Sequence, residues 1–241
     1  MNTNSNVYTV IYTTIVCVLV AAILAFASQA LKPMQDANEK AETIGQILKA
    51  AQFDFDDSSN DAILAFYKEN VASAILVDAT GAKVGELNTA DAAIYGTSDL
   101  KAQNYGVKDE TEYSIPVYIF KNGTSVLPIY GAGLWGPVWG YIAVDKTGLN
   151  IVGAYFDHAS ETPGLGGKIK DDPGFRAQFE GKKLDFSDDK TFSIVKGGAP
   201  EGKANAIDAI SGATMTSKGL DEAINTWIDA YKNYLNKAEE E

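Results

Sequence analysis

A run of roughly 25 residues without a charged side chain, from Val7 to Leu31, constrains the fold of this chain most strongly. A helix of this length exceeds the ~30 Å hydrocarbon core of a bilayer, so the run predicts one transmembrane helix. A cleaved signal peptide is the competing interpretation, because Ala25-Phe26-Ala27 resembles a small-x-small cleavage site. The short polar segment 1–6 contains no Lys or Arg, and the apolar run is longer than a typical signal-peptide core. Both points favour a retained, single-pass anchor over residues 7–31.

The rest of the chain predicts a linker and then a soluble domain. Residues 32–61 are interpreted as a linker, with a helix over 34–51 and an acidic, turn-rich segment over 53–61. The domain follows over residues 62–241. Alternating apolar residues predict strands, and apolar residues at helical spacing predict helices. We expect strands within 74–87 and over 113–120, 125–131, 139–145 and 150–156, helices over 62–67, 172–180 and 217–236, and a loop over 88–111.

Short connections between the strands indicate the fold class. Asn122-Gly123 is a strong signal for a two-residue hairpin turn. Pro116 and Pro128 cannot donate to a strand ladder, so we expect their strands at a sheet edge or at a bulge. Hairpin-linked strands without regular β-α-β alternation predict an α+β fold, in which a mostly antiparallel sheet with packed helices follows one transmembrane helix.

Charge and residue inventory exclude several classes of function. The net charge of -12 argues against binding to nucleic acid, because phosphate backbones attract Lys and Arg. A single cysteine, Cys17, excludes an intrachain disulfide and a thiolate metal site, and a single histidine, His158, excludes a histidine-rich one. We therefore expect no metal site and no catalytic residue acting through side chains alone.

The stretch from Asp208 to Ser217, DAISGATMTS, has the strongest chemical character in the chain. Ser211, Thr214, Thr216 and Ser217 place four hydroxyls within seven positions, directly before an amphipathic helix. Helix N-termini attract anions, and Gly212 permits a tight turn or a close approach. The stretch therefore predicts either a phosphate-binding site or a site of hydroxyl modification. A simple Ser/Thr cap of the helix is the structural alternative.

Two glycine-rich loops are also unusual. The segment 130–140, YGAGLWGPVWG, could present Trp135 or Trp139 to a planar ligand, although both could equally be core residues. The segment 158–167, HASETPGLGG, could present several backbone N–H groups to a ligand, but it matches neither common phosphate-loop pattern. His158 and Glu161 could form an acid–base pair, and surface solvation is the alternative.

Together, these stretches resemble the FMN-binding domain of membrane-bound redox pumps. DAISGAT (208–214) is similar to that family's flavinylation motif, Asp-x-x-Ser/Thr-Gly-Ala-Thr, and ETPGLG (161–166) is similar to its second signature. Gly-Leu-Trp (133–135) resembles a segment of the C subunit of the bacterial Na+-translocating NADH:quinone reductases. The resemblance extends over essentially the whole chain. The G subunit of the Rnf ferredoxin:NAD+ reductases shares the threonine motif and is the nearest alternative family.

The resemblance implies a covalent cofactor and its contacts. FMN would be attached through a phosphoester to the hydroxyl of Thr214, after recognition of Asp208 by a flavin transferase. The spacing of the hydroxyls alone does not distinguish Thr214 from Thr216. By position in the motifs, the further residues at the cofactor would be Ser211, Gly212, Ala213, Thr216, Ser217, Glu161, Thr162, Leu165, Gly166 and Trp135, with Thr216 and Ser217 at the phosphate end.

The resemblance also implies a function, partners and a location. The chain would be an electron-transfer subunit of a sodium pump that couples NADH to quinone, inactive alone. Its partners would be an iron–sulfur subunit, a second flavin subunit, the flavin transferase and the lipid bilayer. It would be a single-pass protein of the bacterial inner membrane, with the domain on the periplasmic, outer side. A membrane-tethered module binding a noncovalent ligand, and a Ser/Thr-nucleophile hydrolase, are the rival functions.

Overall fold

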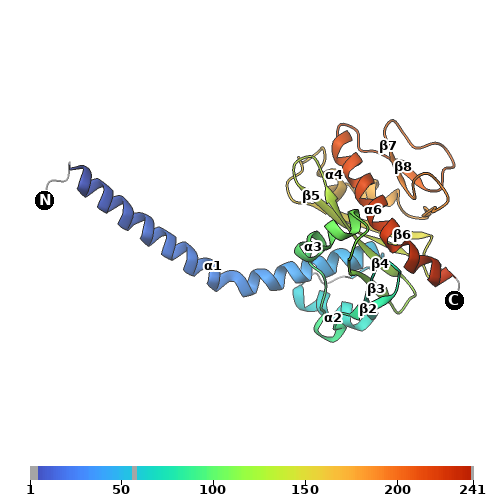
Figure 1. Cartoon of the computed structure of the whole chain (residues 1–241), viewed down its shortest axis with the longest axis horizontal. Coiled ribbons are helices and arrows are strands. Elements are labelled where there is room, and N and C mark those ends of the chain that lie inside the picture. Colours follow the sequence, from blue (N-terminus) through green and yellow to red (C-terminus); the bar gives the residue numbers. More distant parts are fainter. Residues whose placement is uncertain (1–4, 56–58, 240–241) are drawn as a thin grey trace. The chain divides into compact units, whose positions relative to one another are not determined.

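The computed structural model describes residues 5–55 and 59–239, with side chains described as far as Lys237. Parts of the predicted polar N-terminus, the acidic segment and the C-terminal tail lie outside these ranges. The chain divides into two compact units, Met1–Ala41 and Glu42–Glu241. Helix α1 (Asn6–Ala50) belongs to both units and begins one residue before the apolar run (Figure 1).

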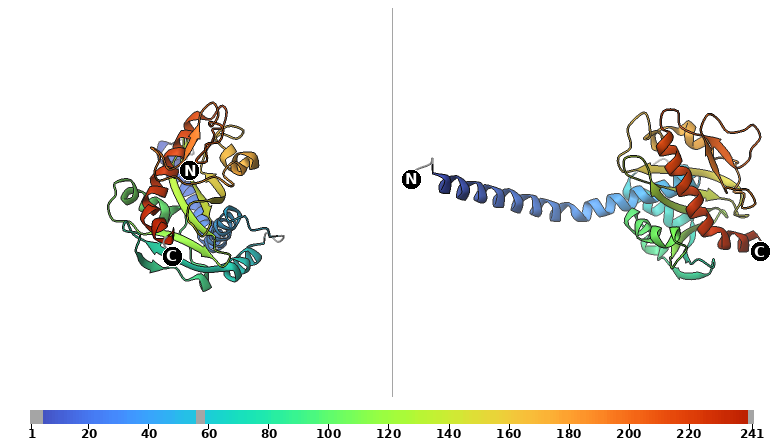
Figure 2. Two further views of the ribbon diagram at one scale, coloured as in Figure 1. Left: turned by 90° about the vertical axis from the view of Figure 1, so that its right-hand side faces the viewer. Right: turned by 45° about the horizontal axis from the view of Figure 1, so that its top comes forward.

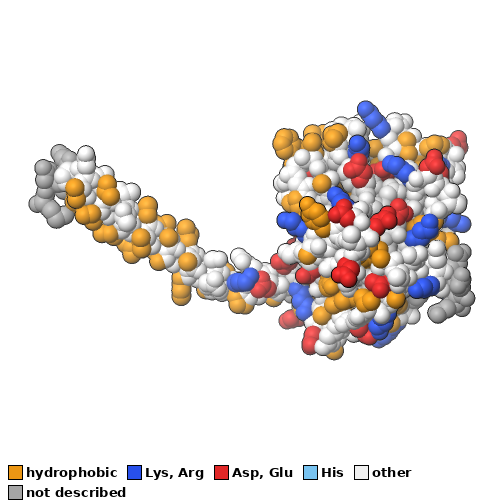
Figure 3. Space-filling view, in the orientation of Figure 1, with side chains coloured by type: hydrophobic (Ala, Val, Ile, Leu, Met, Phe, Trp, Pro, Cys, Tyr) orange, Lys and Arg blue, Asp and Glu red, His pale blue; other side chains and the backbone are white. Residues whose placement is uncertain are grey.

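The first part of α1 has the properties of a membrane span. An 18-residue window of it has a mean hydropathy of 2.7, and none of that window is buried. It is the one helix among the described residues that is long and apolar enough to cross a bilayer. Its side chains form a largely hydrophobic surface, whereas acidic and basic side chains are interspersed on the visible face of the second unit (Figure 3).

The predicted helix over 34–51 exists, but it is neither a separate helix nor entirely a linker. Helix α1 continues through Pro33, although proline cannot donate the usual helical hydrogen bond. Ile44, Ile47 and Leu48, near its C-terminal end, are fully buried in the second unit. The helix therefore supplies part of the core of the second unit, because one face of its last turns is apolar.

The second unit is built on one six-stranded antiparallel sheet, in the order β2-β1-β3-β4-β5-β6, with a two-stranded parallel pair, β7-β8, beside it. The α+β fold class is confirmed. Figure 2 shows α6 crossing one face of the sheet. The elements after α1 are α2 (Asn60–Asn70), β1 (Val71–Val77), β2 (Lys83–Glu86), η1 (Thr89–Asp91), α3 (Thr97–Lys108), β3 (Ile115–Phe120), β4 (Ser125–Ala132), β5 (Pro137–Val144), β6 (Ile151–His158), α4 (Lys168–Asp171), α5 (Pro173–Ala177), β7 (Ser193–Val195), β8 (Ala206–Asp208) and α6 (Thr214–Glu239).

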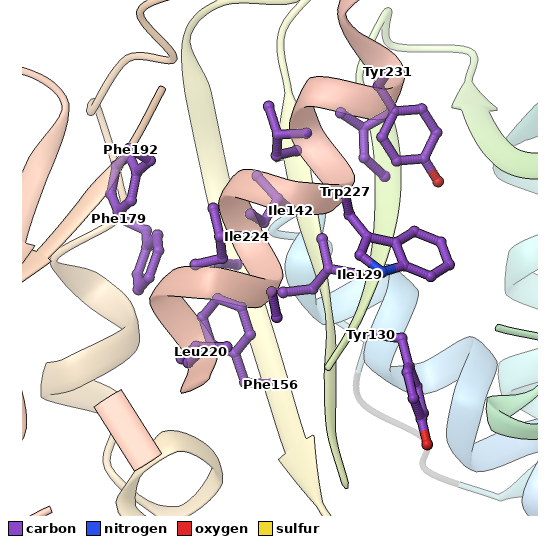
Figure 4. Close-up of a cluster of buried hydrophobic side chains, with 14 of the residues drawn as sticks. Ile129, Tyr130, Ile142, Phe156, Phe179, Phe192, Leu220, Ile224, Trp227 and Tyr231 are labelled. Atoms are coloured by element: carbon purple, nitrogen blue, oxygen red, sulfur yellow. The ribbon is translucent and has the colours of Figure 1, made fainter. Parts of the chain in front are cut away.

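Each face of the sheet carries its own hydrophobic cluster. On one face, the apolar stripe of α6, including Leu220, Ile224 and Trp227, packs on sheet residues such as Ile129 and Ile142 (Figure 4). On the other face, the last turns of α1 pack with α2 on strands β3 to β5. Strands alternate their side chains between two faces, so a sheet covered on both sides needs apolar residues at nearly every position. This explains the nearly continuous apolar sequences of β3 to β5.

The two proline-containing strands are central, so the prediction of an edge position is wrong. Strands β3 and β4 pair only next to the hairpin, at Tyr118–Val126 and Ile119–Ser125. Beyond the hairpin the strands separate, and the Tyr231 hydroxyl donates to the Pro116 carbonyl at 2.9 Å and to that of Pro128 at 3.3 Å. A side chain of α6 thus replaces ladder hydrogen bonds where the two prolines interrupt the pairing.

Three further expectations from the sequence differ from the structure. The predicted loop over 88–111 contains helix α3, which only a few apolar residues, including Leu100 and Val107, anchor to the core. Its Gly106 is required because a Cβ there would overlap the Glu112 carbonyl. The helix expected over 172–180 is shorter, limited to α5. Helix α6 begins earlier than predicted, at Thr214, so the hydroxyl-rich stretch forms its first turn.

Candidate functional site

The three motifs singled out in the sequence meet at one buried carboxylate, that of Glu161, which is 4% exposed. Its Oε1 accepts a hydrogen bond from the backbone N–H of Trp135 at 2.8 Å. Its Oε2 accepts one from the hydroxyl of Thr216 at 2.6 Å. We call this arrangement of Trp135, Glu161 and Thr216 the Glu161 junction. It joins the loop before β5, the loop after β6 and the first turn of α6.

Two glycines make room for the carboxylate. A Cβ at Gly133 would overlap Oε1 of Glu161, and a Cβ at Gly166 would overlap Oε2 and the Thr216 hydroxyl. The glycines of two different motifs therefore enclose the same carboxylate from two sides. The third side is the N-terminal turn of α6, whose unpaired N–H groups favour a negative charge.

The four hydroxyls of the stretch 211–217 have different environments. Thr216 is 1% exposed and donates to Glu161, and Ser217 is 2% exposed and accepts from the backbone N–H of Ile210 at 3.1 Å. Thr214 and Ser211 are exposed. Thr214 is the first residue of α6, and Ser211 lies in the preceding turn. Two hydroxyls thus stabilise the fold, and two are accessible for modification.

The turn before α6 is shaped by Asp208 and Gly212. Asp208 ends strand β8 and is exposed, and its Oδ1 accepts the backbone N–H of Ala199 at 2.7 Å. Gly212 has a φ of 80°, in the left-handed region that favours glycine, and a Cβ there would approach Leu165 to 3.1 Å. This contact places the tip of the ETPGLG loop directly beside the turn that precedes Thr214. Ala213, which lies between Gly212 and Thr214 in the sequence, is buried.

Exposed apolar side chains lie on the same segments as the accessible threonine and the Glu161 junction. Trp135 is 66% exposed, and Leu134, Leu165 and Met215 are also exposed large hydrophobic residues. They lie on the three segments that meet at the Glu161 junction. Thr162 is exposed as well, whereas Gly166 is buried. An apolar, partly aromatic surface beside an accessible hydroxyl suits a flat ring system tethered through a phosphate, so these residues fit FMN.

His158, at the end of β6, holds the start of the ETPGLG loop (161–166). Its Nδ1 accepts the backbone N–H of Glu161 at 3.1 Å. Asp157, its neighbour, is buried, and its Oδ2 accepts hydrogen bonds from Gln46 at 2.8 Å and Lys170 at 2.7 Å. Burial alone would lower the pKa of Lys170, but the hydrogen bond and charge of Asp157 outweigh it, so the pKa is raised. The end of α1 and α4 are both held to β6 here.

Sequence reasoning missed several members of the site. It did not assign a role to Gly133, to Met215 or to Ser160, whose hydroxyl donates to the Trp135 carbonyl at 2.7 Å. The sequence placed Gly133 in a glycine-rich loop and in the Gly-Leu-Trp resemblance, but its steric role depends on a contact with a residue 28 positions later. Trp139, the alternative to Trp135, is only half-buried but packs against both hydrophobic clusters, so it is a core residue.

One sizeable cavity among the described residues lies elsewhere. It has a volume of about 690 Å³ and is lined by residues of the loop 186–191 and the later turns of α6, among them Phe186, Thr191 and Asp229. None of the residues that form the Glu161 junction lines it. Thr214 is not among the lining residues and lies on an exposed surface.

Comparisons with known proteins agree with this geometry. Residues 133–229 match the model of the FMN-binding domain, a range that contains the whole Glu161 junction and Thr214. The chain is 32% identical over 224 residues to the C subunit of the Na(+)-translocating NADH-quinone reductase of Vibrio vulnificus, covering 86% of this chain and 84% of the relative. It is 31% identical over 244 residues to the protein of that name from Neisseria meningitidis serogroup B, covering 95% and 93%.

A solved structure extends the similarity to three dimensions. The crystal structure of the C subunit of the Na(+)-translocating NADH-quinone reductase from Parabacteroides distasonis superposes with a TM-score of 0.72 at 33% sequence identity, covering 85% of this chain and 96% of that one. The two proteins therefore share their fold over most of their length. On sequence, fold and motif geometry together, the chain belongs to the family of C subunits of the Na+-translocating NADH-quinone reductases.

Proposed function

We propose that this chain carries FMN on Thr214 through a phosphoester and serves as an electron-transfer subunit of a membrane-bound, sodium-translocating NADH:quinone reductase. The distribution of hydroxyls carries the proposal. Of the two threonines in the first turn of α6, Thr216 is buried and donates to Glu161, whereas Thr214 is exposed at the helix N-terminus. The family membership supports the same role.

The attachment requires FAD and a flavin transferase. The Thr214 hydroxyl attacks the phosphorus on the riboflavin side of FAD. An ester bond from Oγ1 to phosphorus forms, the pyrophosphate bond breaks, and AMP leaves with the bridging oxygen. The hydroxyl proton passes to a base of the transferase. No oxidation or reduction occurs in this step. Asp208 and Ser211 are both exposed, so the transferase would have access to them.

The residues of the chain bind and orient the cofactor. The first turn of α6 offers N–H groups to the phosphate, and Trp135, Leu165 and Met215 offer an apolar surface to the ring. The Glu161 junction fixes the relative positions of these segments. FMN supplies electron-transfer chemistry that no amino-acid side chain provides. The hydroxyls of Thr216 and Ser217 are buried and hydrogen-bonded within the chain, which supports a role in holding the turn rather than in binding the phosphate.

The partners follow from this role. Electrons would arrive from an iron–sulfur subunit and leave to a second flavin subunit, and the exposed surface around Thr214 is where either would approach. The first part of α1 would anchor the chain in the cytoplasmic membrane, with the second unit on the periplasmic side. This location suits a transferase that acts outside the cytoplasm.

Intact-mass analysis of the full-length protein tests the proposal. When the chain is co-expressed with a flavin transferase, its mass should increase by one FMN less one water. Thr214→Ala should abolish the increase, Thr214→Ser should retain it, and Ser211→Ala, which removes the other exposed hydroxyl, should leave it intact. The absence of any mass gain in the wild type, or its persistence in Thr214→Ala, would refute covalent attachment at Thr214.

The rival functions have less support. The two relatives and the solved structure described above are all C subunits, which favours this family over the Rnf G subunit. A noncovalent binding module would release its flavin on denaturation. A hydrolase would need a base beside its nucleophile, but His158 Nδ1 is hydrogen-bonded to the Glu161 backbone rather than to a hydroxyl.

A further inference from the structure

His158 has a contact that depends on its protonation state. Its Nδ1 accepts a hydrogen bond from the Glu161 backbone N–H at 3.1 Å, so that nitrogen must hold a lone pair. The ring also stands against Gly167, where a Cβ would lie 3.2 Å from Nε2. The Gly167 N–H in turn donates to the Thr162 carbonyl at 3.0 Å. The imidazole therefore packs inside the turn that carries Glu161.

We propose that His158 is a positioning residue, which in its neutral form holds the Glu161 junction together and so presents Thr214 for flavin attachment. The second part of this statement rests on the proposed function, and the first part does not. A protonated imidazole carries N–H groups at both nitrogens and cannot accept the Glu161 N–H. The junction is therefore held when His158 is neutral and weakened when it is protonated.

The route from His158 to Thr214 consists of direct hydrogen bonds and one helical turn. His158 fixes the backbone at Glu161, and the Glu161 carboxylate fixes the Trp135 N–H and the Thr216 hydroxyl. Thr216 lies two residues after Thr214 in the same helical turn. The loop of Trp135 is tied a second time by the Ser160 hydroxyl, two residues after His158. A shift of the segment 158–161 would therefore displace both the aromatic surface and the helix start.

The charges around His158 come from three elements. Asp157 and Glu161 lie on its own segment, Lys168 and Lys170 lie on α4, and Glu42 on α1 pairs with Lys170 at 3.7 Å. Asp157 is already paired with Lys170 and accepts the His158 backbone N–H at 2.7 Å. Strand β5 pairs with His158 through Val138, which does not titrate.

The first test uses the protein without flavin. Because the chain contains one histidine, selective ¹⁵N labelling of histidine in the full-length protein in detergent gives one pair of ring signals. At about pH 8, the nitrogen shifts should show the tautomer with the proton on Nε2 and a lone pair on Nδ1. In a second, uniformly ¹⁵N-labelled sample, the Glu161 amide signal should shift together with the ring signals as the pH falls. Ring shifts that place the proton on Nδ1 would overturn the proposal. A Glu161 amide signal that stays constant while the ring signals change would overturn it as well.

The second test compares two substitutions in flavin attachment. His158→Asn places a carbonyl oxygen near the position of Nδ1 and does not titrate, whereas His158→Ala removes the acceptor. With FAD and a flavin transferase at about pH 8, attachment should be about tenfold slower in His158→Ala and close to wild type in His158→Asn. Relative to His158→Asn, attachment to the wild type should fall about threefold or more on acidification, because a histidine ring can gain a proton and an asparagine amide cannot.

The outcomes separate the two proposals. Failure of the wild type to gain FMN would refute the proposed function, and the tautomer would still decide the role of His158. Equal attachment rates in His158→Ala, His158→Asn and wild type across the pH range would refute the positioning role while leaving Thr214 as the attachment site. If His158→Ala fails to fold, the comparison of wild type with His158→Asn over pH still decides.

Discussion

At the scale of single residues, the site depends on glycines, which have no side chain, as much as on the side chains that are present. The Glu161 carboxylate is buried without a salt bridge to any described Lys or Arg, and it is stabilised by the Trp135 N–H, the Thr216 hydroxyl and the helix N-terminus. Gly133 and Gly166 leave the space in which it lies. The two glycines are therefore needed because a larger residue at either position would collide with the Glu161 carboxylate, and not because the backbone must be flexible there.

Gly166→Ala should destabilise the protein by about 1–3 kcal/mol, because the new methyl group must displace Glu161 or Thr216. Gly45→Ala is the matched control, since a Cβ there would meet only the Ile63 side chain, at 3.8 Å, within a helix. The control should be neutral or stabilising by up to about 1 kcal/mol. Urea unfolding of both full-length variants in detergent measures the difference, and equal effects would contradict the steric explanation.

The sequence identified the motifs, but it did not show which of their hydroxyl groups are buried and which are exposed. Which of Thr214, Thr216 and Ser217 face solvent depends on the residue at which the helix starts. The spacing of the three residues does not give that starting point, so any of them could have been exposed. The structure resolves the ambiguity through the earlier start of α6 and the contacts of Thr216 and Ser217. The contact of Thr216 involves Glu161, far away in sequence, so no local pattern could reveal it.

At the scale of elements, local signals predicted most strands, and alternating apolar residues located β1 and β3 to β6. Asn122-Gly123 lies in the β3–β4 hairpin as expected, but the prediction of a two-residue turn is wrong. The Phe120 N–H donates to the Thr124 carbonyl at 2.8 Å, so the turn has three residues, 121–123, with Gly123 at a φ of 86°. Helix α3 was missed because its sequence has few apolar positions and an internal glycine. The order of strands could not be deduced, since the effect of Pro116 and Pro128 is compensated by Tyr231 from α6, more than 100 residues later.

Tyr231→Phe should destabilise the protein by about 1–3 kcal/mol, because the carbonyls of Pro116 and Pro128 would lose their donor in the core. Tyr67→Phe is a matched control. Tyr67 is also 0% exposed, but its hydroxyl has no hydrogen-bond partner within the described structure. That substitution should be neutral or stabilising. Thermal unfolding distinguishes the two variants, and a larger loss in Tyr67→Phe would show that the assigned hydrogen bonds are wrong.

At the scale of the whole molecule, composition and one apolar run predicted a membrane anchor followed by an α+β domain. The boundary between the two was less accurate, because the last turns of α1 are buried in the domain core. A helical pattern near a membrane span is compatible with a linker or with a core helix. The choice depends on the apolar surface of β3 to β5, which becomes available only after the sheet has formed.

The single-pass arrangement predicts opposite locations for the two ends of the anchor. In a Cys17→Ser background, Glu201→Cys on the exposed surface of the second unit should react with a membrane-impermeant maleimide in cells whose outer membrane is permeabilised. Ser5→Cys, before the anchor, should react only after the inner membrane is broken. The reverse pattern would place the domain in the cytoplasm.

The central claim is that the Glu161 junction buries Thr216 and leaves Thr214 as the threonine that carries FMN. Cleavage after Lys203 and Lys218 yields a single peptide, residues 204–218, that contains all four candidate hydroxyls. Fragmentation of this peptide from the flavin-loaded, full-length protein locates the modification directly. The account predicts the full mass of the FMN phosphoester on Thr214, with Ser211, Thr216 and Ser217 unmodified. FMN on Thr216, or on either serine, would contradict it.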